Sequence, residues 1–164
     1  MARPTPPDGS VARAELALER LFRFAATRTF ATHQRDRIGI DVSRAGYAVL
    51  RCIDDVGAPA LGRIARSCAM DPATVGRQVR QLEADGLVER SRDRHDGRVT
   101  VVRFTDEGRV VYERIVEVRT EYLAGVLARW TARERRELVQ VVDRLVADLR
   151  AVPVDGAAAV RGTG

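Results

Sequence analysis

Hydrogen-bonding side chains of three kinds recur at helical spacing between residues 73 and 81. Thr74, Arg77, Arg80 and Gln81 fall on one face of a predicted helix, with Ala73 beside them. An arginine can donate two hydrogen bonds to guanine, a glutamine can pair with adenine, and a threonine can contact a phosphate or a thymine methyl group. These residue types therefore suit the surface of duplex DNA, provided that one rigid helix presents them together.

The same segment carries the signals of a capped, half-buried helix. Its buried stripe falls at positions i, i+4 and i+7 and comprises Val75, Val79 and Leu82. Asp71 followed by Pro72 predicts the start, because the carboxylate accepts free amide hydrogens and proline fits the first helical position. The helix is expected to end near Asp85, where Gly86 supplies a left-handed cap. The polar face therefore lies opposite the side that packs on the core.

The elements on either side of this helix complete a characteristic order. A short helix is expected from Ala60 to about Ser67, with four inward side chains: Leu61, Ile64, Ala65 and Cys68. Two strand-like runs, Leu87–Arg92 and Arg98–Phe104, flank the polar turn Asp93–Gly97 and predict a hairpin. Short helix, tight turn, capped helix and hairpin together form a winged helix-turn-helix, whose second helix enters the DNA major groove.

Charge at the hairpin and in the preceding helices fits an anionic partner. Arg94 and Arg98 flank the predicted turn, where one arginine can reach a narrow minor groove while Asp96 orients its neighbour. The alternative is a charged loop that serves solubility alone. Between Leu61 and Arg80 the chain holds four arginines against one acid, an excess that favours contact with a polyanion.

Two helices are predicted before the winged unit. The apolar residues of Val11–His33 cover too broad a face for packing on one side only. Asp41 or Ser43 can cap a second helix that runs through Asp54 with its apolar face inward. The inward residues expected there are Tyr47, Val49, Leu50 and Ile53.

Two longer helices are predicted after the winged unit. Thr105 can cap the first, which covers about residues 106–129. Its expected apolar side comprises Val110, Val111, Ile115, Val118, Tyr122, Val126 and Leu127. Thr131 and Glu134 have the spacing of a capping box that opens the last helix, and Pro153 ends it.

Composition narrows the function classes further. The 164 residues carry a formal net charge of +5 and a pI of about 10.1, and the 28 strongly basic residues are all arginine. With only His33 and His95, no clustered carboxylate pair and no glycine-rich phosphate loop, we expect neither an enzyme nor a bound cofactor or metal.

Cys52 and Cys68 lie within apolar helical patterns, which predicts buried thiols. No run reaches the roughly 18 apolar residues of a membrane span, so we expect a cytoplasmic protein.

The stretch from Ser43 to Arg114 resembles the MarR (multiple antibiotic resistance regulator) family of winged-helix repressors. The most specific matches are the runs 71–77 (DPATVGR), 82–88 (LEADGLV), 93–98 (DRHDGR) and 104–108 (FTDEG). The family carries an aspartate two residues before an arginine that enters the minor groove, and Asp96 and Arg98 occupy those places. By position, Thr74 and Arg77 resemble its base or phosphate readers.

The resemblance implies a homodimer whose first and last helices interlock, and a two-fold dimer implies a palindromic operator in double-stranded DNA. The fold class is then mainly α with a small β-hairpin wing. The expected layout is a disordered leader at 1–10, a single domain at 11–152 and a flexible tail at 153–164. The domain comprises the DNA-binding lobe 41–104 and the dimerisation helices 11–35 and 106–152.

The resemblance also implies a small aromatic or phenolic effector, which many such regulators bind between the dimer helices and the DNA-binding lobe. The residues that would line such a pocket here are Phe24, Arg28, Phe30, His33, Tyr47 and Arg51. Aromatic residues at helical spacing also occur simply as core. Relatives that sense organic hydroperoxides use a cysteine on the first helix, and none stands there in this chain, so peroxide sensing is not expected.

Three residues depart from the family pattern. Gly76 stands where a polar residue is common. Gly46 replaces a glutamine and weakens its helix by about 1 kcal/mol relative to a good helix former. Ala69 stands in the turn, where glycine is often found.

The function expected from these residues is that of a sequence-specific regulator of transcription, acting as a repressor. Two alternatives stay open. One is a nonspecific architectural protein that bends or bridges DNA. The other is a winged-helix module whose arginine face pairs with an acidic protein.

Overall fold

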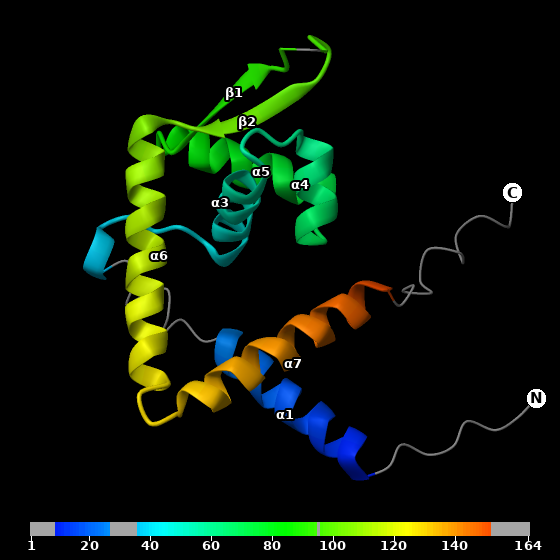
Figure 1. Cartoon of the computed structure of the whole chain (residues 1–164). Coiled ribbons are helices and arrows are strands. Elements are labelled where there is room, and N and C mark those ends of the chain that lie inside the picture. The colour runs from blue at the N-terminus through cyan, green and yellow to red at the C-terminus, as the bar shows by residue number, and fades with distance from the viewer. Residues whose placement is uncertain (1–8, 27–35, 95, 152–164) are drawn as a thin grey trace, which may run out of the picture. The chain divides into compact units, whose positions relative to one another are not determined.

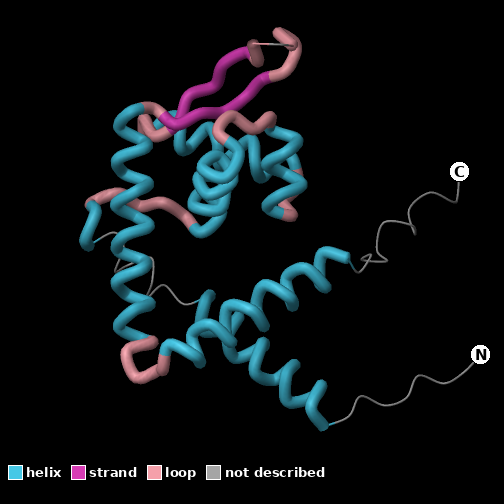
Figure 2. The backbone as a smooth tube through the Cα atoms, in the orientation of Figure 1, coloured by secondary structure: helices cyan, strands magenta, loops and turns pink. Residues whose placement is uncertain are grey.

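The computed structural model describes residues 9–26, 36–94 and 96–151 (Figure 1). Its elements are α1 (Gly9–Ala26), α3 (Arg44–Val56), α4 (Leu61–Cys68), α5 (Pro72–Ala84), β1 (Val88–Arg92), β2 (Thr100–Phe104), α6 (Asp106–Val126) and α7 (Ala132–Ala151). Helices dominate, and the two strands form an antiparallel hairpin, as the sequence predicts (Figure 2). The chain divides into two compact units, residues 1–119 and 120–164.

The core of the first unit lies between three helices and the hairpin. α3, α4 and α5 pack against one another, while β1 contacts α5 and β2 contacts α3 and α4. Figure 1 shows the hairpin across one end of this helical group, with α6 beside it. Buried side chains come from each of these elements: Val49, Leu50, Ile53, Ile64, Val75, Val79, Leu82, Val88, Val102 and Ile115. The three core residues predicted on α5 are therefore confirmed, and its opposite face is left outward.

Local chemistry fixes both ends of α5. The Asp71 carboxylate accepts a hydrogen bond from the Thr74 N–H at 2.8 Å, and Pro72 occupies the first turn. Gly86 follows the last turn with a φ of +72°, a left-handed conformation that favours glycine. Both predicted caps of this helix are confirmed.

The start of α6 is pinned to the end of α5. Thr105 Oγ1 accepts a hydrogen bond from the Gly108 N–H at 2.8 Å and donates one to the Gly86 carbonyl at 2.6 Å. Gly108 is buried, and a Cβ there would lie 1.7 Å from the carbonyl oxygen of Leu87. The predicted cap at Thr105 is confirmed. Glycine at position 108 allows α6 to approach the Leu87 backbone closely.

The hairpin is shorter on its turn side than the sequence predicts. Arg92 pairs with Thr100 in the last strand pair before the turn. The sequence predicts a strand from Arg98, but the N–H of Arg98 is held by the Asp96 carboxylate at 3.0 Å. Arg98 therefore belongs to the turn. We call the hairpin together with this turn the wing, residues 88–104.

Helix bounds and faces differ from the sequence predictions at several positions. α1 already begins at Gly9, inside the predicted leader, and residues 27–35 of the predicted first helix lie outside the described residues. On α6 the sequence predicts Val110 and Val126 inward, but their side chains are 66% and 57% exposed. Tyr112 is buried instead, because its hydroxyl finds polar partners inside the first unit.

The second unit contains the end of α6 and the whole of α7. The predicted capping box is confirmed: the Thr131 N–H donates to the Glu134 carboxylate at 2.6 Å, and the Glu134 N–H donates to Thr131 Oγ1 at 3.2 Å. Exposed apolar side chains on α7 comprise Val139, Val141, Val142, Val146 and Leu149. No helix among the described residues combines the length and the apolar character needed to cross a lipid bilayer.

Candidate nucleic-acid interface

The outward face of α5 carries the five residues predicted to contact DNA. Ala73, Arg77, Arg80 and Gln81 are exposed, and Thr74 is half-buried at the edge of the face. Arg77 Nη2 lies 3.5 Å from Thr74 Oγ1, and Gln81 Nε2 donates to Asp85 Oδ1 at 3.0 Å. We call these five residues the reading face. The buried stripe on the other side of α5 fixes the direction in which they point.

The wing turn is shaped by two aspartates. Asp93 Oδ1 accepts a hydrogen bond from the Asp96 N–H, and Asp96 Oδ1 accepts one from the Arg98 N–H, both at 3.0 Å. Asp96 therefore orients Arg98 through the backbone N–H of the arginine. Arg94, Asp96 and Arg98 are all exposed. The guanidinium groups at the wing tip are thus presented to solvent on a turn with internal hydrogen bonds.

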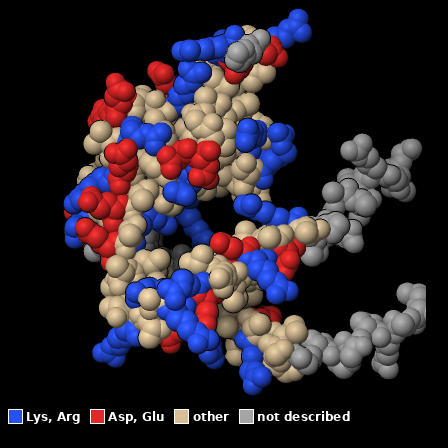
Figure 3. Space-filling view, in the orientation of Figure 1, with Lys and Arg blue, Asp and Glu red and all other residues tan. Residues whose placement is uncertain are grey.

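Charge is unevenly spread over the first unit. Figure 3 shows arginine side chains gathered at the wing and over α4, and acidic side chains over α3 and along α6. Arg63 and Arg66 on α4 are exposed, as are Arg77 and Arg80 on α5. Exposed arginines are therefore present on both helices of the helix-turn-helix and on the wing, as the sequence predicts.

Contacts on both flanks of α5 were missed by the sequence analysis. Ser43 Oγ donates to Gln78 Oε1 at 2.7 Å, which joins the cap of α3 to the middle of α5. Glu83 near the end of α5 accepts two hydrogen bonds from Arg90 Nε, at 3.0 and 3.2 Å. These partners lie on different elements, so no local spacing rule predicts them.

The three departures from the family pattern differ in their local surroundings. A Cβ at Gly46 would lie 3.2 Å from Ser43 Oγ and 3.3 Å from Val42 Cγ1, so glycine here allows tight packing of the α3 start. Ala69 adopts the left-handed conformation with a φ of 50°, which strains a residue with a side chain. At Gly76 a Cβ would meet only Arg80 Nη1, at an ordinary 3.6 Å.

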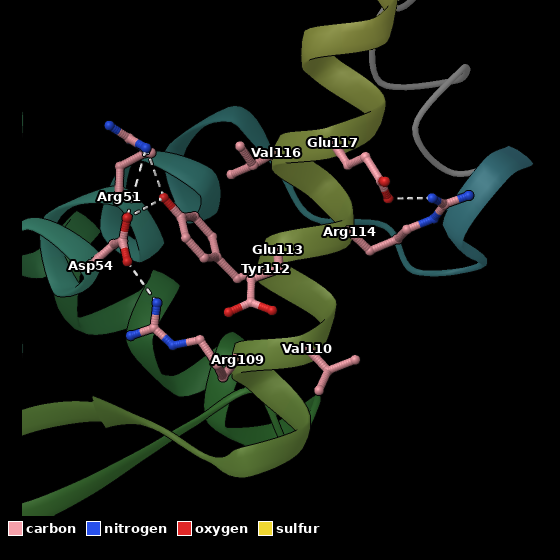
Figure 4. Close-up of a pocket in the computed structure, with 9 residues that line it drawn as sticks. All are labelled: Arg51, Asp54, Arg109, Val110, Tyr112, Glu113, Arg114, Val116 and Glu117. Carbon is pink, nitrogen blue, oxygen red and sulfur yellow. Dashed lines mark hydrogen bonds and ion pairs between the residues drawn. The ribbon is translucent and has the colours of Figure 1, made fainter.

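An open groove of about 650 Å³ lies beside α3 and α6 (Figure 4). Its lining comprises Arg51, Asp54, Arg109, Val110, Tyr112, Glu113, Arg114, Val116 and Glu117. Figure 4 shows Arg51, Asp54, Arg109 and Tyr112 turned toward one another between the two helices. The Tyr112 hydroxyl donates to Asp54 Oδ2 and accepts from Arg51 Nη1, each at 2.9 Å, and Arg109 Nη1 pairs with Asp54 Oδ1 at 2.6 Å.

The ionisation of this cluster follows from its contacts. The Arg109 guanidinium holds the pKa of the Asp54 carboxyl below its ordinary value, with the Tyr112 hydroxyl acting in the same direction. Burial raises the pKa of Tyr112 to about 12, reinforced by the hydrogen bond to Asp54. At neutral pH the carboxyl is charged and the phenol is neutral, and the two arginines that reach Asp54 or Tyr112 already have partners.

The six residues predicted for an effector pocket are only partly described. Three lie outside the described residues: Arg28, Phe30 and His33. Arg51 lines the groove. Tyr47 stacks 6.3 Å from the Tyr112 ring and lies beneath the guanidinium of Arg119, 3.8 Å from its ring centre. Phe24 on α1 is 60% exposed. A pocket formed by the six together stays a prediction.

The two cysteines are free thiols with different burial. Cys52 is buried as predicted, whereas Cys68 and the neighbouring Leu61 are only half-buried. Cys68 Sγ donates to the Ala48 carbonyl at 3.4 Å, and burial raises the pKa of this thiol, with the Cys52 thiol adding to the effect. Among the residues that the structure describes, no group of three or more His, Cys, Asp or Glu side chains is placed to hold a metal.

Comparison with known sequences points to one family. Residues 42–100 match the model of the MarR family. The chain is 40% identical over 76 residues to the HTH-type transcriptional regulator YdgJ of Bacillus subtilis, a stretch that covers 46% of each protein. It is 28% identical over 131 residues to the HTH-type regulator YxaD of the same organism, covering 80% of this chain and 91% of YxaD. The chain thus spans just under half the length of one relative and most of the other.

Solved structures agree with the sequence comparison. A probable transcriptional regulator from Pseudomonas aeruginosa is 28% identical with a TM-score of 0.64, covering 78% of this chain and 96% of that one. BpsR of Bordetella bronchiseptica, whose DNA binding is described as regulated by 6-hydroxynicotinic acid, is 25% identical with a TM-score of 0.61, covering 79% and 98%. The family match lies on the helix-turn-helix and most of the wing described above. Residues 42–100 therefore form a MarR-family segment, and the chain is similar over most of its length to helix-turn-helix transcriptional regulators.

Proposed function

We propose that this chain represses transcription by binding one DNA sequence through the reading face of α5 and the wing. The observation that carries the proposal is the opposition of two faces on α5. Val75 and Val79 are buried on one side, while Arg77, Arg80 and Gln81 are exposed on the other. A helix anchored in this way can enter a major groove without losing its core contacts.

The proposed binding form is a homodimer on a palindromic operator. Support comes from exposed apolar side chains on α1 in the first unit and on α7 in the second. On α1 these include Leu21, Phe22 and Phe24, and on α7 they include Val142 and Leu149. Such surface is unfavourable for a monomer in water and suits a subunit contact. A two-fold dimer then places two reading faces on half-sites about one helical turn apart.

A small aromatic effector completes the proposal. The groove beside α3 and α6 has the size of a small-molecule site, and the related BpsR is described as responding to 6-hydroxynicotinic acid. Apolar contacts would come from Val110 and Val116. Binding there would act on the contacts of Asp54 and Tyr112, which join α3 to α6.

The test begins with selection of preferred sequences from a random duplex library, followed by binding measured by fluorescence anisotropy. We expect the full chain to prefer the selected duplex over a scrambled one by at least about 1,000-fold at physiological salt. Arg77→Ala and Arg98→Ala should each weaken operator binding by about 5- to 150-fold. Arg133→Ala, on α7, removes the same charge from an 82% exposed side chain and should leave affinity almost unchanged.

The alternatives predict other outcomes. Equal affinity for all duplexes would identify a nonspecific architectural protein. Negligible DNA binding, or affinity unchanged by Arg77→Ala and Arg98→Ala, would instead favour a module that pairs with an acidic protein.

For the effector, 6-hydroxynicotinic acid serves as the probe. A change in operator affinity that Val110→Trp abolishes supports the groove, and a change that Val110→Trp leaves intact contradicts it.

A further inference from the structure

The reading face of α5 is bordered by one polar contact on each flank. Gln78 accepts a hydrogen bond from Ser43 Oγ at 2.7 Å on the side of α3. On the side of the wing, Glu83 accepts from Arg90 Nε through both carboxylate oxygens, at 3.0 and 3.2 Å. The second contact is partly shielded, since the Arg90 and Glu83 side chains are 39% and 35% exposed.

The positions of these residues on the helix explain why they do not belong to the reading face. Successive residues turn by about 100° around an α-helix. Gln78 and Glu83 therefore lie about 140° apart and border the buried stripe on its two sides. The Gln78 side chain contacts the cap of α3, and the Glu83 side chain contacts β1. Together the two contacts fix the rotation of α5 about its own axis.

The contact of Glu83 continues from α5 to the tip of the wing. Arg90 lies in the middle of β1, opposite Val102 of β2. Two residues further along the same strand, Arg92 Nη1 donates to the carbonyl oxygen of Arg98 at 3.4 Å. An arginine at the wing tip is thus connected to α5 through one strand and two side-chain contacts.

We propose that Glu83 and Arg90 are a positioning pair that locks the wing to α5, so that Arg98 and Arg77 meet DNA as one unit. The inference rests on the proposed DNA binding. Neither member of the pair is part of the reading face or the wing turn. Their role is to set the distance and angle between a helix in the major groove and a wing in the adjacent minor groove.

The Arg90 guanidinium also holds the pKa of the Glu83 carboxyl below its ordinary value. The carboxylate is therefore charged under ordinary assay conditions, and its neutral isostere is an informative replacement. Glu83→Gln keeps the shape of the side chain and removes the ionic part of the contact. Glu83→Arg combined with Arg90→Glu reverses the pair while leaving the net charge unchanged.

The experiment compares affinity for the selected operator with affinity for a scrambled duplex in the full chain. Glu83→Gln should lower this ratio about three- to fivefold, the upper range for a partly exposed pair. The double reversal should restore it to within about twofold of the parent. Glu137→Gln is the matched control, because Glu137 pairs with Arg133 on α7 and the same charge is lost. Its ratio should not change.

A second measurement asks whether the two DNA contacts are coupled. In the parent, Arg77→Ala and Arg98→Ala should be non-additive in operator binding, whereas in the Glu83→Gln background they should become additive. A structural defect alone would lower affinity without removing this coupling. An unchanged ratio in Glu83→Gln, or coupling that persists there, overturns the proposal.

Hydrogen exchange of the free protein separates failure of this proposal from failure of the proposed function. Amides of the wing, including the Asp93 N–H bonded to the Val99 carbonyl at 2.9 Å, should exchange several-fold faster in Glu83→Gln and regain protection in the double reversal. If the parent selects no duplex, the proposed function fails. Unaltered wing exchange in Glu83→Gln would then overturn the positioning role as well, and faster exchange would support the lock between the wing and α5.

Discussion

Replacing Asp54 by asparagine removes the charge at the centre of the cluster that joins α3 to α6. The carboxylate pairs with Arg109 Nη1 at 2.6 Å and accepts from the Tyr112 hydroxyl at 2.9 Å. Asparagine is nearly isosteric, but it has one oxygen acceptor in place of two and turns an N–H₂ group toward one of its former donors. The perturbation is therefore electrostatic rather than steric.

The expected magnitude follows from exposure. The Asp54 side chain is 31% exposed and that of Arg109 is 41% exposed, so water screens their attraction and limits its contribution to about 1 kcal/mol. The Tyr112 side is buried, and loss of a charge-assisted hydrogen bond there costs about 1 to 1.5 kcal/mol. The free energy of unfolding should therefore fall by about 2 kcal/mol, which lowers Tm by about 4 to 8 °C.

The assay is urea and thermal unfolding at one fixed protein concentration, repeated over a pH series. Because the pKa of Asp54 is lower in the folded state, its stabilisation is fully present above about pH 4 and is lost as pH falls through the folded pKa. The difference between the parent and Asp54→Asn should therefore be constant at neutral pH and shrink in acid.

Asp55→Asn is the matched control for this prediction. Asp55 follows Asp54 on the same helix, but its side chain is 63% exposed and lies 3.6 Å from Arg51. The same loss of charge should cost less than about 0.5 kcal/mol there. Equal effects of the two substitutions, or a difference that grows in acid, would refute the account of the cluster.

Three further predictions concern backbone strain, close packing and thiol chemistry. Ala69→Gly should stabilise the protein by about 1 kcal/mol, because Ala69 has a φ of 50°, and a lower urea midpoint would contradict this. Gly108→Ala should destabilise it by at least about 3 kcal/mol in the same assay, because the new Cβ would meet the Leu87 carbonyl oxygen at 1.7 Å. Cys68 should react with iodoacetamide at pH 7 more slowly than free cysteine, because burial raises its pKa, and the buried Cys52 should react more slowly still. Mass spectrometry of timed samples checks both thiols.

Each of these predictions has a matched control within the chain. Gly62→Ala on α4 adds a Cβ only 3.8 Å from Arg66 Nη1, so it should stabilise the helix slightly where Gly108→Ala disrupts packing. Ala147→Gly in the exposed part of α7 should destabilise by about 1 kcal/mol, the opposite sign to Ala69→Gly. For the thiols, the urea-unfolded chain should react as fast as free cysteine.

Sequence reasoning succeeded where local chemistry decides the structure. The Asp71 cap, the left-handed Gly86 and the capping box at Thr131 each involve residues within four positions, and all are present. The stripe of Val75, Val79 and Leu82 could be found because α5 packs on one side only. The reading face follows from that stripe by geometry alone.

The sequence did not reveal features that depend on tertiary contacts. Tyr112 is buried because Arg51 and Asp54 on another helix satisfy its hydroxyl, and no period within α6 shows this. Val110 follows the same helical pattern as its buried neighbours and yet is exposed, because the adjacent groove leaves it uncovered. The sequence predicts that Arg98 begins a strand, but its N–H donates to the Asp96 carboxylate within the turn.

Hydroxyl-radical footprinting on the selected operator tests the central claim most directly, because it maps where the reading face and the wing lie on DNA. We expect a two-fold symmetric footprint with two half-sites about one helical turn apart. Arg98→Ala should lose only the flanking minor-groove protection, and Arg77→Ala should weaken protection across both half-sites. A footprint without symmetry, or one that Arg98→Ala leaves unchanged, would contradict the claim that α5 and the wing bind DNA together.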